Sequence, residues 1–145
     1  GQYAHGNEPS HHITHMYNYV NRPWRTQELV DSVLYNQYFN APDGLSGNED
    51  CGQMSAWYIL NSMGFYQVCP GKPVYSIGRP LFNEATVHLK DGKSFKVIAH
   101  NNSRDNKYVR SIVLNGNKLE TPFFTHQDIV DGGTLELTMG SEPLK

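Results

Sequence analysis

The sequence predicts an α+β fold, in which helices over residues 1–66 precede a small antiparallel β-sandwich or sheet over residues 67–145. In the first part, apolar residues recur at spacings of three and four, which is the period of a helix. After Pro70 they alternate with polar residues, which is the period of a strand. Asp-Gly and Asn-Gly pairs separate the alternating runs and are strong hairpin signals. We therefore place one boundary, near residues 66–73.

The composition narrows the range of functions that this chain can have. The chain has 145 residues, which is enough to bury a core, and its formal net charge of −2 argues against non-specific nucleic-acid binding. No apolar run approaches the roughly 18 residues of a membrane span, and no signal peptide opens the chain. Helical periodicity begins within the first residues, so we expect a piece of a longer protein. Frequent aromatic and asparagine side chains suit sugar recognition, although an ordinary β-rich domain has them too.

We expect a first helix over residues 10–21, because Ile13, Met16 and Val20 follow one another at helical spacing. A second helix is expected over residues 23–39, since proline is favoured at the first helical position. The segment 40–42, Asn-Ala-Pro, ends it.

The opening turn of the first helix carries His11, His12 and His15. His11 and His15 lie four residues apart and therefore share a face, as a pair of transition-metal ligands would. A zinc-binding helix of the known type also needs a glutamate directly after its first histidine, and none is present. This pattern favours structural or sugar-contacting histidines over a metal site.

A third helix is expected from about Gly52 to Gly64, where a glycine supplies the C-terminal stop. It is apolar on nearly every face, which is typical of a buried helix. Three helices are too few to surround it, so either the β part of this chain or sequence outside the chain must cover it, and we expect the second. The cysteines at positions 51 and 69 flank this helix, whose length of roughly 18 Å separates them and favours free thiols.

The second part of the chain is expected to consist of short strands. Alternating patterns predict them at residues 74–77, 85–89, 95–99, 109–114 and 135–139. Asp91-Gly92 and Asn115-Gly116 are the expected hairpin turns. A short strand and a one-turn helix are expected over residues 123–129.

The loop that precedes the third helix is the strongest candidate for a site. Between the turn-forming Asp43 and the glycine at position 52, it presents Asn48, Glu49 and Asp50 directly ahead of a helix N-terminus. Asp50 can serve as a helix cap, which is the commoner role of such a residue. The same arrangement can equally present carboxylates to a ligand.

Several motifs resemble one known family. They are Gly6-Asn7-Glu8-Pro9-Ser10-His11-His12, Tyr17-Asn18-Tyr19, Pro23-Trp24-Arg25-Thr26-Gln27, the segment from Asp43 to Tyr58, and Gly64-Phe65-Tyr66. In order and spacing they resemble the C-terminal part of glycoside hydrolase family 92, whose members are exo-acting α-mannosidases. The resemblance runs through nearly the whole chain.

The resemblance implies an N-terminal β-domain and an (α/α)₆ toroid. Residues 1–66 would supply the last helices of the toroid, and residues 67–145 a terminal β segment. The partners would be mannose-containing glycans and the rest of the same protein. Many members of the family are exported by glycan-degrading bacteria, so a periplasmic or cell-surface location is expected.

The resemblance also implies calcium-dependent hydrolysis with inversion, acting on N-glycans or mannan. Asp50 matches the general base. Asn48 occupies a position that is acidic in some members, where it can orient water but cannot accept a proton. The general acid of the family is a glutamate in a motif upstream of residue 1, so we expect the isolated chain to be inactive.

Asn7 and Glu8 match a loop that lines the sugar pocket of the resembling enzymes, and Glu8 is a candidate calcium contact. A stabilising charge at the following helix is the alternative for Glu8. Glu49 is a candidate sugar contact, with a local turn or ion-pair role as its alternative. The sequence leaves the other calcium ligands and the linkage specificity open.

Two other functions compete with the hydrolase. The first is a carbohydrate-binding module without chemistry, and the second is a histidine-based metalloenzyme. Asp50 separates the first from the hydrolase, since Asp50→Asn abolishes turnover only in an enzyme. Zinc titration of variants at His11 and His15 tests the second.

Overall fold

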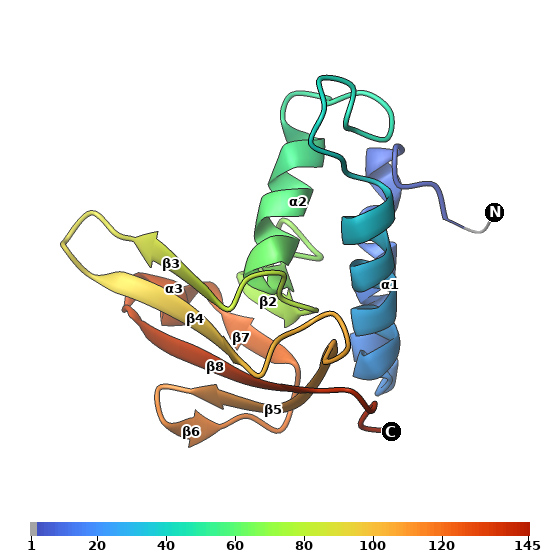
Figure 1. Ribbon diagram of the computed structural model, residues 1–145. Coiled ribbons are helices and arrows are strands. Elements are labelled where there is room, and N and C mark those ends of the chain that lie inside the picture. Colours follow the sequence, from blue (N-terminus) through green and yellow to red (C-terminus); the bar gives the residue numbers. More distant parts are fainter. Residues whose placement is uncertain (1–2) are drawn as a thin grey trace.

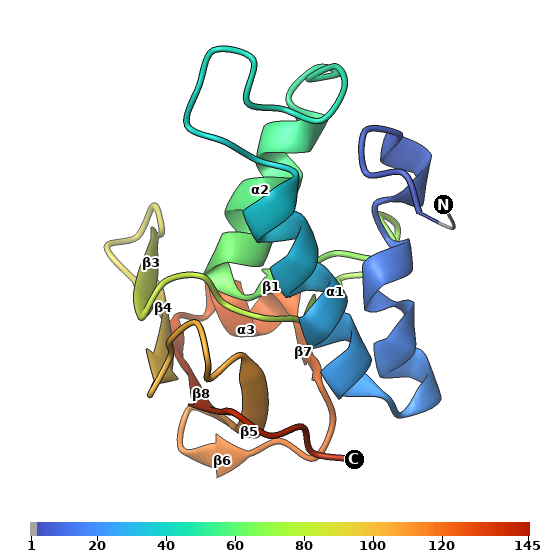
Figure 2. The same cartoon turned by 45° about the vertical axis from the view of Figure 1, so that its right-hand side comes forward.

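The structure is a computed structural model that describes residues 3–145. Its helical part stands to one side of the strands (Figure 1). It comprises the short 3₁₀ helices η1 (Glu8–Ser10) and η2 (Ile13–Val20) and the α-helices α1 (Pro23–Asn36) and α2 (Gln53–Met63). η2 and α1 pack side by side, and both views show them antiparallel (Figure 2).

The second part forms two sheets. One sheet has three strands in the order β1 (Phe65–Tyr66), β2 (Val74–Ile77) and β7 (Phe123–Thr125). The other has five, in the order β3 (Glu84–His88), β4 (Ser94–His100), β8 (Gly133–Gly140), β5 (Tyr108–Leu114) and β6 (Asn117–Lys118). The helix α3 (His126–Val130) separates β7 from β8. The α+β class predicted from the sequence is confirmed.

One strand pair departs from the antiparallel expectation. β4 and β8 are parallel, from Phe95 beside Gly133 to His100 beside Thr138. A parallel pair needs a long crossover connection, and the chain between these strands runs through β5, β6, β7 and α3. The alternation of apolar residues shows that a strand forms but not in which direction its neighbour runs, so the sequence could not reveal this pair.

The predicted hairpin turns and the predicted end of α2 are confirmed. The turns at Gly92 and Gly116 join β3 to β4 and β5 to β6, and both glycines have positive φ angles, 73° and 80°. Gly64, at φ 103°, ends α2. α1 begins at Pro23 as expected but ends at Asn36, three residues earlier than predicted.

Two apolar clusters form the core, and α2 contributes to both. Trp57, which is fully buried, packs with Val30, Val33 and Leu34 of α1. Leu60 and Met63 lie against the larger cluster between the sheets. The buried members of that cluster are Phe65, Ile77, Phe95, Val97, Ala99, Val109, Phe124, Ile129, Leu135, Leu137 and Met139. α2 thus fixes the loop before it relative to both parts of the chain.

The first helix differs from its prediction. It is a 3₁₀ helix, and the apolar residues that predicted it face outward, with Ile13 39%, Met16 45% and Val20 60% exposed. Its buried face is polar, because Asn18 donates hydrogen bonds to Ser76 Oγ and Ile77 O of β2, at 2.7 and 2.8 Å. Periodicity locates an apolar stripe but does not show whether this chain covers it.

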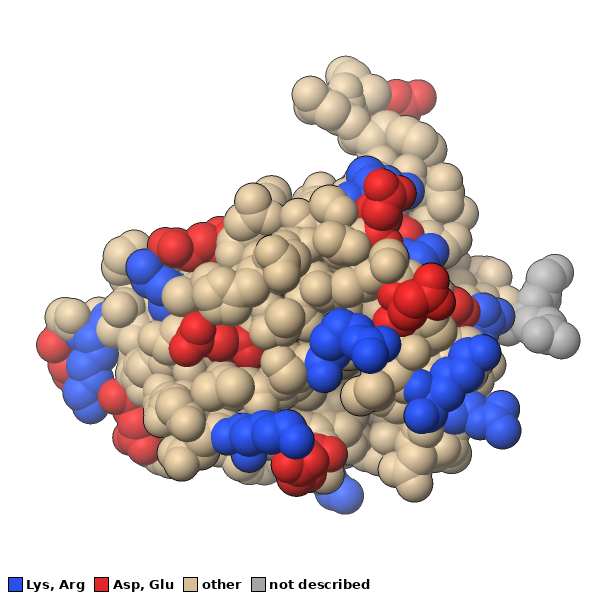
Figure 3. All heavy atoms as spheres, turned by 60° about the horizontal axis from the view of Figure 1, so that its bottom comes forward, with Lys and Arg blue, Asp and Glu red and all other residues tan. Residues whose placement is uncertain are grey.

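The surface carries charges of both signs. On the face shown in Figure 3, Lys and Arg side chains alternate with Asp and Glu side chains and form no continuous basic patch. Within residues 3–145, no helix combines the length and apolar character needed to cross a lipid bilayer.

Candidate functional site

The loop before α2 has an unusual backbone. Asp50, Cys51 and Gly52 all have positive φ angles, of 46°, 58° and 91°. This left-handed region is costly for residues other than glycine, by about 1 to 3 kcal/mol each. Non-glycine residues held in this region cluster at functional sites, where the surrounding structure enforces the conformation. The run turns the chain sharply so that the Asp50 side chain meets η1.

Asp50 and Glu8 form a carboxyl pair. Their carboxyl groups are close enough to share a hydrogen bond, and this bond and the negative charge of Glu8 raise the pKa of Asp50. A hydrogen bond from its own backbone N–H, together with the bond to Asp50, lowers the pKa of Glu8. Glu8 Oε1 is shielded from solvent, and no group of residues 3–145 forms a hydrogen bond with it.

This pair lies on the wall of an open cavity of about 520 Å³. The cavity is built from η1, the start of α2 and the segment that follows β1. Its lining residues are Glu8, Pro9, His11, His12, Asp50, Gln53, Tyr66, Gln67, Val68 and Pro70. Two carboxyl groups, two amides, two imidazoles and a phenol thus border one space, which is a set suited to a polyhydroxylated ligand.

A hydrogen-bonded row connects three of the lining side chains. His11 bonds through Nε2 to the carbonyl oxygen of His5 at 2.9 Å. Gln53 Nε2 lies 3.1 Å from His11 Nδ1 and donates to Tyr66 Oη at 3.2 Å. A further hydrogen bond holds the backbone of His11, because Trp57 Nε1 donates to its carbonyl oxygen at 3.1 Å. The sequence singled out His11 only as a possible metal ligand, and nothing local marked Gln53 or Tyr66.

The other predicted site residues lie apart from this pair. The Glu49 carboxylate accepts from Ser55 N at 3.0 Å and from Ser55 Oγ at 2.8 Å, so it holds the first turn of α2. Asn48 and Asn7 are exposed and are not among the residues that line the cavity. The structure therefore brings together Glu8 and Asp50 but not Asn7, Asn48 or Glu49.

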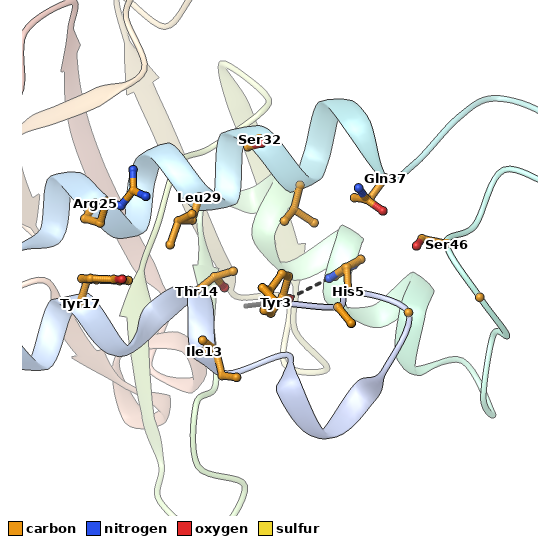
Figure 4. Close-up of a pocket in the computed structure, with 14 residues that line it drawn as sticks. Tyr3, His5, Ile13, Thr14, Tyr17, Arg25, Leu29, Ser32, Gln37 and Ser46 are labelled. Carbon is orange, nitrogen blue, oxygen red and sulfur yellow. Dashed lines mark hydrogen bonds between the residues drawn. The ribbon is translucent and has the colours of Figure 1, made fainter. Parts of the chain in front are cut away.

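A second cavity, of about 830 Å³, lies between η2 and α1 (Figure 4). At its base Tyr3 Oη and Tyr38 Oη bond to the two ring nitrogens of His5, at 2.8 and 2.5 Å. Burial and the neighbouring His11 lower the pKa of His5 to about 4. The figure shows the Tyr3 to His5 bond, with Ile13 and Thr14 on one wall and Leu29 and Ser32 on the other. None of the described residues that line this cavity carries a carboxyl group.

His15 and the two cysteines are not among the described residues that line the cavity of the carboxyl pair. His15 is buried and bonds to Ser76 Oγ at 3.0 Å and to Asn61 Oδ1 at 2.8 Å, and burial lowers its pKa to about 4. Across residues 3–145, no three His, Cys, Asp or Glu side chains gather as a metal-binding group. Cys51 and Cys69 are free thiols, as expected, and both are exposed.

Comparison with known proteins gives one consistent result. Residues 1–141 match the glycosyl hydrolase family 92 catalytic domain. A family GH92 α-mannosidase from Bacteroides thetaiotaomicron is 44% identical over 99% of the chain, with a TM-score of 0.94. A family GH92 inverting mannosidase from the same organism is 46% identical, with a TM-score of 0.91. An uncharacterized secreted glycosidase from Arthroderma benhamiae is 31% identical over 94% of the chain. The chain spans only 19%, 19% and 18% of these proteins' lengths.

Proposed function

The chain belongs to glycosyl hydrolase family 92, and on that premise we propose that it forms part of the active site of an exo-acting α-mannosidase. Its substrates would be N-glycans or mannan with terminal mannose. The observation that carries the proposal is the carboxyl pair of Glu8 and Asp50 on the wall of an open cavity. A catalytic-domain family favours this function over a binding module without chemistry.

Asp50 is the proposed general base of an inverting reaction. An inverting glycosidase uses one carboxylic acid to protonate the leaving oxygen and a second carboxylate to activate water on the opposite face of the sugar. Asp50 lies at the mouth of a cavity that is open to water, as such a base must. Asn48, two residues earlier in the same loop, is proposed to help to orient the water.

Glu8 is the proposed partner of this base. Its negative charge raises the pKa of Asp50, which makes the Asp50 carboxylate a stronger proton acceptor once it is ionised. Its Oε1 atom, shielded and without another partner, is available to a sugar hydroxyl or a cation. Asn7, adjacent to it, and Glu49, on the base's loop, are proposed as further sugar contacts.

Calcium is the proposed cofactor. Calcium prefers six to eight oxygen ligands, and the unpartnered carboxylate oxygen of Glu8 is a donor of that kind. Within residues 3–145 no three His, Cys, Asp or Glu side chains gather there, so further oxygens, such as amide or backbone carbonyls, water or groups from the rest of the catalytic domain, are needed to complete the site. When bound, calcium would supply positive charge that fixes and polarises sugar hydroxyls.

The general acid is proposed to lie in the part of the catalytic domain outside this chain. Loss of a proton donor alone costs a factor of about 10² to 10⁴ in rate. The 145-residue chain by itself is therefore expected to release no mannose. An exported enzyme, in the periplasm or at the cell surface, fits a substrate made of extracellular glycans.

The proposal is tested on the full-length enzyme that carries this segment. α-1,2-Mannobiose is supplied with calcium or with a chelator, and the first-formed mannose is followed by proton NMR. We expect release of the β-anomer, which indicates inversion, and loss of release after chelation. Release of the α-anomer would contradict the role of Asp50 as a base, and no release from any α-mannoside would contradict the proposed function.

A further inference from the structure

The direction of each hydrogen bond in the row from His5 to Tyr66 follows from its first member. A carbonyl oxygen only accepts, so His11 Nε2, 2.9 Å from His5 O, carries a proton. In the neutral imidazole the other nitrogen, Nδ1, is then an acceptor. The Gln53 group that faces it at 3.1 Å must be the NH₂ donor. One buried carbonyl thus sets the orientation of the Gln53 amide.

The same NH₂ group donates to Tyr66 Oη at 3.2 Å. The Tyr66 oxygen is therefore an acceptor toward Gln53, and its own O–H proton is left for another acceptor. Gln53 is the one hydrogen-bond partner of the Tyr66 hydroxyl within residues 3–145. Because Tyr66 and Gln53 both line the cavity with Glu8 and Asp50, that proton faces the space in which a ligand would lie.

We propose that the Tyr66 hydroxyl donates a hydrogen bond to a hydroxyl oxygen of the bound sugar, and that Gln53 is the positioning residue that keeps it a donor. This inference rests on the proposed function and adds to it a specificity-determining contact. The carboxylates of the cavity only accept when ionised, whereas a sugar hydroxyl both donates and accepts. Tyr66 supplies the donor that complements Glu8 and Asp50, so a sugar hydroxyl between them is satisfied in both directions.

The inference is tested with Tyr66→Phe in the full-length enzyme and a set of α-linked mannobiosides that each lack one hydroxyl. For the intact disaccharide, kcat/KM should fall by about 3- to 10-fold, which is the value of a neutral hydrogen bond. For the one analogue that lacks the contacted hydroxyl, the variant and the wild type should be equally active. Tyr58→Phe is the matched control, because it removes a hydroxyl from α2 at a different cavity.

Gln53→Glu tests the positioning role. A carboxylate at this position can no longer donate, so Tyr66 must turn its proton toward it and away from the sugar. The variant should therefore repeat the substrate pattern of Tyr66→Phe, although the hydroxyl is still present. If Tyr66→Phe shows the pattern and Gln53→Glu does not, the role of Gln53 is wrong.

If Tyr66→Phe lowers kcat/KM equally for all analogues, or does not lower it at all, the proposed contact is wrong. Turnover by the wild type would in that case still support the hydrolase. If the wild-type enzyme releases no mannose from any of the disaccharides, the proposed function and this inference both fall.

Discussion

At the scale of single residues, the pairing of the Glu8 and Asp50 carboxyl groups predicts a change in a pH profile. The base acts only when ionised, and Glu8 raises the pKa at which Asp50 ionises. In Glu8→Gln the negative charge is gone, so the acidic limb of the kcat/KM profile should move to lower pH, whatever the loss in rate. Glu49→Gln is the control, because that carboxylate bonds to Ser55, and it should leave the limb in place. An unmoved limb in Glu8→Gln would show that the two groups are not coupled.

Two buried histidines make stability pH-dependent. Burial is the main cause that lowers the pKa values of His5 and His15 to about 4. The unfolded chain, with histidine pKa values near 6.5, therefore binds more protons below neutrality, and the stability present above about pH 6.5 is lost toward pH 4. Each histidine should add up to about 1.4 kcal/mol per pH unit to this slope.

Urea unfolding at pH 7.5, 6 and 5 measures the slope. His15→Asn should reduce the pH dependence of the unfolding free energy by about the contribution of one bound proton. The substitution of the exposed His88 by Asn should leave that pH dependence unchanged. Parallel curves for the wild type and His15→Asn would contradict the account.

At the scale of elements, the left-handed run before α2 determines where Asp50 points. Gly52 has a φ of 91°, and a Cβ added there would meet no atom within 4 Å. Gly52→Ala should therefore cost backbone strain alone, about 1 to 2 kcal/mol, and should lower activity by turning the loop. Gly71→Ala is the matched control, because that position is equally open and its φ is ordinary. The midpoints of denaturant unfolding compare the two, and equal midpoints would count against strain at Gly52.

The sequence predicted those elements whose signals are local. Gly64 ended α2, and Gly92 and Gly116 marked their hairpins, because a positive φ is a requirement that glycine meets. The prediction for η2 was wrong in helix type, and the sequence did not show that its polar face is the buried one, where His15 bonds to Ser76 and Asn61, both distant in sequence. No local pattern in η2 could reveal those partners.

At the scale of the whole molecule, one ion cluster joins the helical part to the strands. Asp31 of α1 pairs with Arg79 Nε at 3.0 Å and with Arg104 at 3.2 Å. The Arg79 side chain is 1% exposed, so Asp31→Asn would leave a buried charge uncompensated and should cost about 3 to 5 kcal/mol.

Arg104→Gln, at a side chain that is 58% exposed, should cost about 1 kcal/mol or less. Calorimetric unfolding of the two variants separates these values. Equal costs would show that Asp31 and Arg79 do not hold the two parts together.

The candidate site shows the limit of the sequence at this scale. The glycines and acids of the loop before α2 made Asp50 a candidate site residue or a helix cap, and only the family resemblance named it as the base and pointed to Glu8. Their meeting depends on how η1 packs beside the start of α2, which residue spacing does not specify. Only the structure shows that Gln53 and Tyr66 lie beside this pair. Each contributes a single polar group, and the two come from separate elements, α2 and β1. The sequence thus predicted the fold class, and it named Asp50 as a candidate base, but it did not predict the cavity wall.

The most direct test of the account is the kcat of the full-length enzyme as wild type, Asp50→Asn and Asp43→Asn on α-1,2-mannobiose. Asp43 lies in the same exposed loop, so its substitution controls for the change of charge. If Asp50 is the general base, Asp50→Asn lowers kcat by about 10² to 10⁴ while KM changes little, and Asp43→Asn retains activity. Undiminished kcat in Asp50→Asn would contradict the account and would leave Asp50 as a residue that only shapes the start of α2.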